Sequence, residues 1–230
     1  VAAMSKPLRL VIFDVDGTLV DSQGDIVAAM TAAFAAVDAP APSRAEILSI
    51  VGLSLDVAMT VLAPTRPTGD HLAMVEAYKA AYMTLRAEAG VAQSSPLYPG
   101  ALDTLRRLHG EPEVLLGVAT GKSKRGLDKL IAGHGLGGLF ITQQVADFHP
   151  SKPHPSMIHQ AMADAGVGPE ATVMIGDTSF DMDMAAAAGV TGIGVKWGYH
   201  GPERLAAAAH LVEDFAALPA LLEQIWSIPA

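Results

Sequence analysis

Two aspartates stand two residues apart at the point where an apolar run ends. The segment VIFDVDGTL, residues 11–19, places Asp14 and Asp16 at this point. In an extended segment, residues two apart point to the same side, so both carboxylates face one small volume. Such a pair is unfavourable unless a cation or a shared proton relieves the repulsion. The spacing therefore predicts a site that binds a cation or holds a proton.

Polar residues also follow two later apolar runs. Thr120 and Gly121 come directly after the run at 114–119, and Asp177 follows the run at 173–175. If these runs are neighbouring parallel strands, their carboxyl ends lie at one edge of a sheet, which is where ligands bind in such folds. We therefore expect these residues to lie close to the two aspartates.

Two further charged residues belong to the same group. Asp181 lies four residues after Asp177, and Lys152 lies in SKPHP, just before a predicted helix whose first position is Pro155. The converging set would hold carboxylates, one hydroxyl and one ammonium. Hard oxygen ligands bind Mg²⁺, and a substrate phosphate completes its octahedral coordination. The composition of the set therefore indicates a site for Mg²⁺ and a phosphate. Asp181 is also a candidate N-cap of its helix, a common use of aspartate.

Strands that alternate with helices must position these groups. Apolar runs typical of strands covered on both faces stand at 8–13, 114–119, 173–175 and 193–195. Helical patterns stand at 101–108, 123–134, 155–165, 181–188 and 215–225. This alternation predicts an α/β fold with a doubly wound, mostly parallel, Rossmann-like sheet.

One segment interrupts the alternation. Residues 21–96 contain helical patterns only, so we expect an inserted all-helical cap domain above the end of the first strand. Residues 1–20 and 97–230 then form the α/β core domain. Asp21 is expected to cap the first helix of the insertion.

Composition restricts the classes of function. The formal net charge of −9 argues against nucleic acid or an anionic membrane as a partner. The absence of cysteine excludes thiolate catalysis, iron–sulfur clusters and disulfides. There is no apolar run near the ~18 residues of a membrane span. Residues 1–10 lack the long apolar region of a signal peptide. We therefore expect a cytoplasmic protein.

Four motifs occur in order, namely DVDGTL, ATG, KPHP and GDTSFDM, with the helical insertion after the first. This set resembles the haloacid dehalogenase-like hydrolase superfamily, in particular its phosphatases with a helical cap. VGLSL at 51–55 and WGYH at 197–200 further resemble phosphoglycolate phosphatases. The resemblance extends over nearly the whole chain.

The resemblance implies a role for each motif residue. Asp14 would be the nucleophile that forms an aspartyl phosphate. Asp16 would be the general acid that protonates the leaving alkoxide and then the base that deprotonates water. Thr120 and Gly121 would bind the phosphoryl oxygens, and Lys152 would neutralise their growing charge and hold Asp14 in position.

The resemblance also implies a Mg²⁺ site. Its ligands would be the Asp14 carboxylate, the Asp16 backbone carbonyl and Asp177, while Asp181 would order the waters of the ion. The sequence thus favours a Mg²⁺-dependent phosphatase for a small phosphorylated metabolite, with 2-phosphoglycolate the leading substrate. We expect a monomer or homodimer.

Several alternatives stay open. An inorganic pyrophosphatase, a nucleotidase and a sugar phosphomutase share these motifs, as would a binding module without turnover. Dehalogenases of the superfamily lack the second aspartate, so Asp16 argues against that activity. Mutases carry an arginine in the cap loop that corresponds to residues 52–56, where this chain has Leu55.

Other polar residues have less specific interpretations. Cations of the cap would bind a substrate carboxylate or remain solvated; they are Arg66, Lys79 and Arg86. Cations in the first turn of a helix oppose its dipole, and we expect exposure for Lys122, Lys124 and Arg125. Asp183 is expected to be solvated. The histidines at 149, 154 and 159 lack a usual metal-ligand spacing, although His154 is a candidate neighbour of the site.

Overall fold

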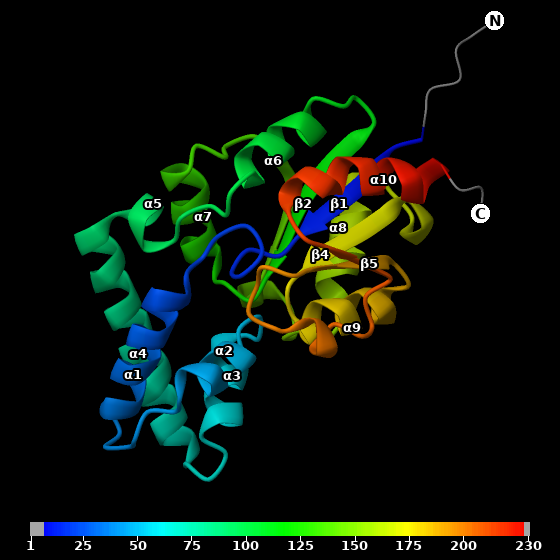
Figure 1. Cartoon of the computed structure of the whole chain (residues 1–230). Coiled ribbons are helices and arrows are strands. Elements are labelled where there is room, and N and C mark those ends of the chain that lie inside the picture. Colours follow the sequence, from blue (N-terminus) through cyan, green and yellow to red (C-terminus); the bar gives the residue numbers. More distant parts are fainter. Residues whose placement is uncertain (1–6, 228–230) are drawn as a thin grey trace, which may run out of the picture.

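The computed structural model of the chain describes residues 7–227. Its strands are β1 Arg9–Phe13, β2 Val114–Thr120, β3 Phe140–Val145, β4 Thr172–Gly176, β5 Thr191–Val195 and β6 His210–Val212. Within the described range they form one six-stranded sheet in the order β3-β2-β1-β4-β5-β6 (Figure 1). All of its neighbouring strands pair in parallel. The fold class predicted from the alternation of strands and helices is confirmed.

Helices cover both faces of the sheet. They are α6 Ala101–His109, α7 Lys124–Gly133 and α10 Leu218–Ser227 on one face, with α8 Ser156–Ala165 and α9 Ser179–Ala188 on the other. Val11 and Phe13 pack in the first hydrophobic cluster, whereas Leu10 and Ile12 pack in the second. Because alternate residues of β1 face opposite layers and both layers are buried, this strand is a continuous apolar run. Short 3₁₀ helices stand at η1 Ala146–Phe148, η2 Pro169–Ala171, η3 Pro202–Arg204 and η4 Phe215–Ala217.

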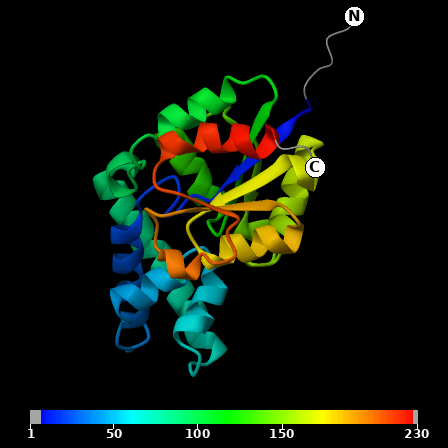
Figure 2. The same cartoon turned by 45° about the vertical axis from the view of Figure 1, so that its right-hand side comes forward.

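The segment between β1 and α6 is helical. It contains α1 Gln23–Ala35, α2 Arg44–Ser49, α3 Leu55–Leu62, α4 Thr68–Ala89 and α5 Val91–Ser94. Figures 1 and 2 show α1 to α4 beside the sheet. Residues from α1 to α4, including Met30, Met59 and Met74, form a separate hydrophobic cluster. This cluster supports our proposal that residues 21–96 are a cap domain.

The chain leaves and re-enters the α/β part of the molecule at adjacent points. Val20 and Leu97 form an isolated antiparallel bridge. The Asp21 N–H donates to the Pro96 carbonyl oxygen at 2.9 Å, and the Tyr98 N–H donates to the Leu19 carbonyl oxygen at 3.0 Å. The two connections to the helical segment therefore lie side by side.

The structure adds two strands that the sequence did not predict. β3 and β6 lie at the two edges of the sheet, and their residues Ile141 and Leu211 are exposed. An edge strand is covered less completely than a central one, so it lacks the continuous apolar run by which the central strands were found. In the part of the chain that the structure describes, no helix is long and apolar enough to cross a membrane. The signal-peptide expectation concerns residues 1–10, of which 1–6 lie outside the described range.

Candidate active site

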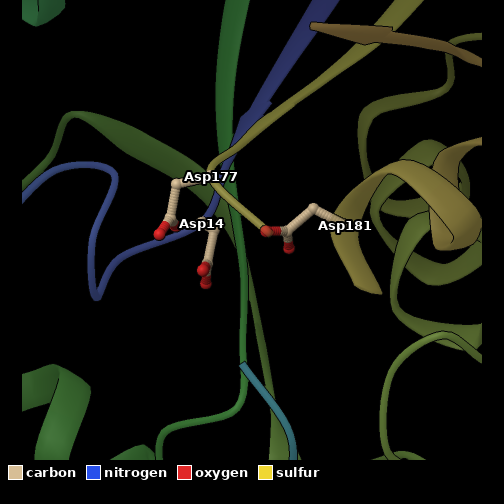
Figure 3. A group of neighbouring side chains, drawn as sticks. All are labelled: Asp14, Asp177 and Asp181. Carbon is tan, nitrogen blue, oxygen red and sulfur yellow. The ribbon is translucent and has the colours of Figure 1, made fainter. Parts of the chain in front are cut away.

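Three buried aspartates meet at the carboxyl edge of the sheet. Asp14 follows β1 and Asp177 follows the neighbouring β4, while Asp181 lies in the first turn of α9. One carboxylate oxygen from each lies within 4.8 Å of those from the other two. Figure 3 shows Asp14 and Asp177 close together, with Asp181 directed toward them from its helix. The strand order therefore brings together carboxylates that are far apart in the sequence.

Lys152 links two of these carboxylates. Its side chain is fully buried, and its Nζ lies 2.9 Å from Asp14 Oδ1 and 2.7 Å from Asp181 Oδ1. Burial lowers the pKa of Lys152, but the negative charges of Asp14 and Asp181 outweigh this effect and raise the pKa above its ordinary value. Lys152 is therefore a buried ammonium that depends on its two acidic partners.

The site carries more negative charge than Lys152 neutralises. Burial raises the pKa of Asp14 to about 7, and the charges of Asp181 and Asp16 act in the same direction, against Lys152. Burial also raises the pKa of Asp177 well above its ordinary value, aided by the charges of Asp14 and Asp181. Within residues 7–227, Asp14 Oδ2 has no hydrogen-bond partner.

These observations test whether a divalent cation fits the site. Buried carboxylates that repel one another would be stabilised by a nearby cation. The donors are hard oxygen atoms, the type that Mg²⁺ prefers. The residues present therefore fit Mg²⁺.

Asp181 occupies a different capping position from the one expected. The N-cap of α9 is Thr178, and Asp181 is the third helical residue of a capping box. Its Oδ2 accepts from the Thr178 N–H at 3.0 Å and from the Thr178 hydroxyl at 2.7 Å. The expectation of Asp181 as N-cap is wrong because the helix begins two residues earlier, at Ser179. Both oxygens of Asp181 are thus engaged by the protein.

Asp16 is not part of this triad and forms an ion pair with Lys122. Lys122 Nζ donates to Asp16 Oδ1 at 2.6 Å and to Oδ2 at 2.7 Å, and the Ser22 hydroxyl donates to Asp16 Oδ1. The side chain of Lys122 is only 10% exposed, so the expectation that Lys122 is solvated is wrong. Burial is the largest single influence on the pKa of Lys122 and lowers it, but the charge of Asp16, the neighbouring Tyr82 and the hydrogen bonds to Asp16 together raise the pKa above its ordinary value. The ion pair compensates Lys122 for its loss of hydration.

Thr120 and Gly121 lie at the end of β2 in the wall of a cavity. This cavity has a volume of about 730 Å³, and Asp14 and Asp16 also line it. The Thr120 hydroxyl accepts from the Lys122 N–H at 3.2 Å. A Cβ on Gly121 would lie 2.6 Å from the carbonyl oxygen of Gly52, so only glycine fits beneath this cap loop. The cavity thus extends from the predicted nucleophile into the helical segment.

The sequence reasoning missed the residues that hold Asp177. Its Oδ1 accepts from the Thr18 hydroxyl at 2.9 Å, and its Oδ2 accepts from the Tyr199 N–H at 2.8 Å. A Cβ on Gly17, which has φ of 84°, would lie 2.2 Å from Asp177 Oδ2, and a Cβ on Gly198 would lie 2.0 Å from Asp177 Cβ. The first motif and WGYH therefore meet around Asp177. The glycines in both motifs were the available signal, since glycine allows a close approach of the backbone.

The cations of the cap separate into different environments. Arg86 is buried and lines the cavity. Lys79 also lines it but is exposed and pairs with Glu76 at 2.9 Å. Arg66 pairs with Asp70 at 3.1 Å and is not a lining residue.

The remaining expectations concern local structure. Ser22 occupies the N-cap position of α1 without a side-chain capping bond, while Asp21 Oδ1 accepts from the Gln23 N–H at 3.3 Å, so Asp21 caps the first helical N–H as expected. Pro155 precedes α8, which begins at Ser156. Asp183 and Arg125 are exposed as expected, and Lys124 is partly exposed. His154 is exposed and its Nδ1 accepts from the Ser156 N–H, so it makes no contact with the triad.

Comparisons with known proteins identify relatives of this chain. The family model described as haloacid dehalogenase-like hydrolase matches residues 11–195. The probable phosphatase IndB of Dickeya dadantii is 38% identical over 207 residues, which are 88% of this chain and 86% of that protein. The phosphoglycolate phosphatase of Pseudomonas putida is 32% identical over 217 residues, which are 91% of this chain and 78% of that protein. The crystal structure of a predicted phosphoglycolate phosphatase from Haemophilus somnus 129PT has a TM-score of 0.80 at 23% identity, with 94% of this chain and 99% of that chain covered. At this identity the last comparison establishes a shared fold.

Proposed function

The chain belongs to the haloacid dehalogenase-like hydrolases, and from this premise we propose that it hydrolyses a small phosphomonoester through a phosphorylated Asp14. It is a phosphoric monoester hydrolase, since its relatives in Dickeya dadantii and Pseudomonas putida are named phosphatases. The observation that carries the proposed mechanism is the buried Asp14. One of its carboxylate oxygens is held by Lys152, and the other has no hydrogen-bond partner among the residues described.

We propose that Asp14 and Asp16 divide the chemistry into two steps. Oδ2 of Asp14 attacks the phosphorus atom, and the bond from phosphorus to the leaving oxygen breaks while Asp16 gives that oxygen a proton. A water molecule then loses a proton to Asp16 and attacks the phosphorus atom, which releases phosphate and the Asp14 carboxylate. Lys122 contacts both carboxyl oxygens of Asp16 and orients this group in the cavity wall.

The other residues bind and orient the phosphoryl group. The Thr120 hydroxyl and the Gly121 N–H would donate to its oxygens, because both residues line the cavity beside Asp14. Lys152 holds Asp14 in position and offsets the negative charge of the site. The carboxylates of Asp14 and Asp177 and the Asp16 carbonyl would bind Mg²⁺. Bound Mg²⁺ supplies charge stabilisation for the phosphoryl oxygens.

Asp181 would act outside the direct ligands of the ion. Its Oδ1 is held by Lys152 and its Oδ2 by Thr178. These contacts fix the orientation of the carboxylate, and the resemblance implies that it orders Mg²⁺-bound waters.

The leading substrate we propose is 2-phosphoglycolate. The name of the Pseudomonas putida relative supports this choice, whereas the name of the Dickeya dadantii relative specifies no substrate. A nucleoside monophosphate is the second candidate. The cavity of about 730 Å³ and the stacked rings of Tyr78 and Tyr82 in its wall favour a leaving group larger than glycolate.

Hydrolysis of p-nitrophenyl phosphate tests the reaction class and the metal requirement. We expect turnover with Mg²⁺ and none in excess chelator, while equal rates in both conditions would contradict the Mg²⁺ proposal. The Asp14→Asn variant should fold but lose turnover. Retention of even a tenth of the activity would show that another residue is the nucleophile.

A substrate panel tests the identity of the leaving group. The kcat/KM values for 2-phosphoglycolate, nucleoside monophosphates, pyrophosphate and β-glucose 1-phosphate should be compared on the same preparation. We expect 2-phosphoglycolate to have the highest value. A preference for any of the others would support the corresponding alternative, and no turnover on the whole panel would support a binding module.

A further inference from the structure

A buried arginine lines the cavity without a counter-ion. Arg86 lies in the last turn of α4 and is 7% exposed. Its Nη1 donates to the Gly126 carbonyl oxygen at 3.2 Å, but its Nε and Nη2 have no hydrogen-bond partner within residues 7–227. No ion pair to Arg86 is found in the same range. Charged groups are rarely buried without a partner, because their loss of hydration then goes uncompensated.

The surroundings of Arg86 are cationic and aromatic. Two cations lie over the Tyr82 ring. The Arg86 guanidinium carbon lies 5.3 Å from the ring centroid, and Lys122 Nζ also lies 5.3 Å from it. The charge of Arg86 lowers the pKa of Lys122, so the two cations are close enough to repel each other. Both oxygens of Asp16 are already engaged by Lys122. This part of the cavity wall therefore has an uncompensated positive charge.

The two unpartnered nitrogens define the shape of the missing group. Nε and Nη2 lie on one edge of the planar guanidinium, and their N–H bonds point in parallel directions. This pair of donors matches the two oxygens of a carboxylate, which accept them in a bidentate contact. Gly126 accepts from Nη1, whereas the two nitrogens of the paired edge are buried and have no acceptor among residues 7–227.

We propose that Arg86 binds a carboxylate on the leaving group of the substrate, so that it determines specificity in this cavity. This assignment rests on the proposed phosphatase function. The phosphoryl group would bind at Asp14, Thr120 and Gly121, and the leaving group would extend along the wall formed by Lys122 and the tyrosines. A phosphomonoester whose leaving group carries a carboxylate would provide the phosphoryl group for Asp14 and the carboxylate for Arg86.

The experiment compares two substrates whose leaving groups have similar size. They are 2-phosphoglycolate and 2-hydroxyethyl phosphate, which has an alcohol in place of the carboxylate. The variants are Arg86→Met and Arg86→Lys, with Arg66→Met as a matched control. Arg66 is a cap arginine that has its own acidic partner and does not line the cavity.

Arg86→Met should lower the ratio of kcat/KM for 2-phosphoglycolate over that for 2-hydroxyethyl phosphate by about 10- to 100-fold, the usual effect of losing a charge-assisted contact. Arg86→Lys should recover part of the ratio, because it restores the charge without the paired donors. Arg66→Met should leave the ratio unchanged. An equal loss on both substrates in Arg86→Met would show a structural role and overturn the proposal.

A binding measurement separates this proposal from the proposed function. Calorimetry with 2-phosphoglycolate should give a Kd about 10- to 100-fold weaker for Asp14→Asn/Arg86→Met than for Asp14→Asn alone. Equal Kd values would overturn the role of Arg86. If the wild type hydrolyses no phosphomonoester, the proposed function fails, but the Kd comparison still decides whether Arg86 binds this anion. Pyrophosphate and nucleoside monophosphates lack a carboxylate. If the wild type preferred one of them to 2-phosphoglycolate, and Arg86→Met lowered the kcat/KM for that substrate, the assignment of Arg86 to a carboxylate would be overturned.

Discussion

Replacement of Lys152 by methionine should destabilise the protein strongly when no metal is present. The substitution keeps most of the apolar stem of the side chain but removes the charge between Asp14 and Asp181, which Nζ contacts at 2.9 and 2.7 Å. Removing one partner of a buried ion pair costs about 3–5 kcal/mol, because the remaining charge is left uncompensated. Here two carboxylates lose the same partner, so we expect a value near the upper end of that range.

Urea unfolding in excess chelator at pH 7.5 measures this cost. The Lys152→Met variant should regain part of its stability with Mg²⁺, since the ion would supply positive charge next to the same carboxylates. The cost should also be smaller at pH 5, because the pKa of Asp14 is raised to about 7 and a protonated Asp14 needs no counter-charge.

An exposed ion pair provides the control. Lys196 pairs with Glu213, whose side chain is 74% exposed, so Lys196→Met should change the free energy of unfolding by about 0–1 kcal/mol. The reasoning would be refuted if Lys152→Met in chelator were no more destabilising than this control.

Two further predictions concern the same edge of the sheet. Gly17 has φ of 84°, and Gly17→Ala would place a Cβ 2.2 Å from Asp177 Oδ2. This variant should lower the free energy of unfolding in urea by about 1–3 kcal/mol and weaken Mg²⁺ binding measured by calorimetry. The control Gly24→Ala, which meets nothing within 4 Å, should show neither effect, and wild-type behaviour of Gly17→Ala would contradict the close approach. In chelator, the free energy of unfolding should fall as the pH rises from about 4 to about 7, because native Asp14 keeps a proton that the unfolded chain releases near the ordinary pKa of 3.8. Urea titrations across this range should show this fall in the free energy of unfolding in chelator but not with saturating Mg²⁺. A free energy of unfolding that does not change with pH in chelator would argue against the raised pKa of Asp14.

The central strands and the positions of the aspartates were predictable from local pattern. β1 is buried on both faces, so its apolar run identified it, and the change to Asp14 marked the strand end. The rule that ligands bind at the carboxyl ends of parallel strands then placed Asp177 near it. These inferences need only residue types and the order of elements along the chain.

Contacts between distant segments were not predictable in the same way. Lys122 lies just before Ser123, the N-cap of α7, where a lysine is usually solvated, and only its contact with Asp16 shows why it is buried. Two loops approach Asp177 closely, one at Gly17 and the other at Gly198, and these glycines are far apart in the sequence. Charge and size at such positions are set by partners that no local pattern contains.

The paired connections at Val20 and Leu97 have a consequence for how this protein could diversify. The helical segment begins and ends next to one antiparallel bridge, between Val20 and Leu97. A different helical segment whose two ends are equally close together could therefore be attached at these two residues. The sheet and its aspartates would not need to be rebuilt. A chimera that exchanges residues 21–96 for the equivalent segment of a relative would thus transfer preference for the leaving group as a single cassette, while the reacting carboxylates stay those of this chain.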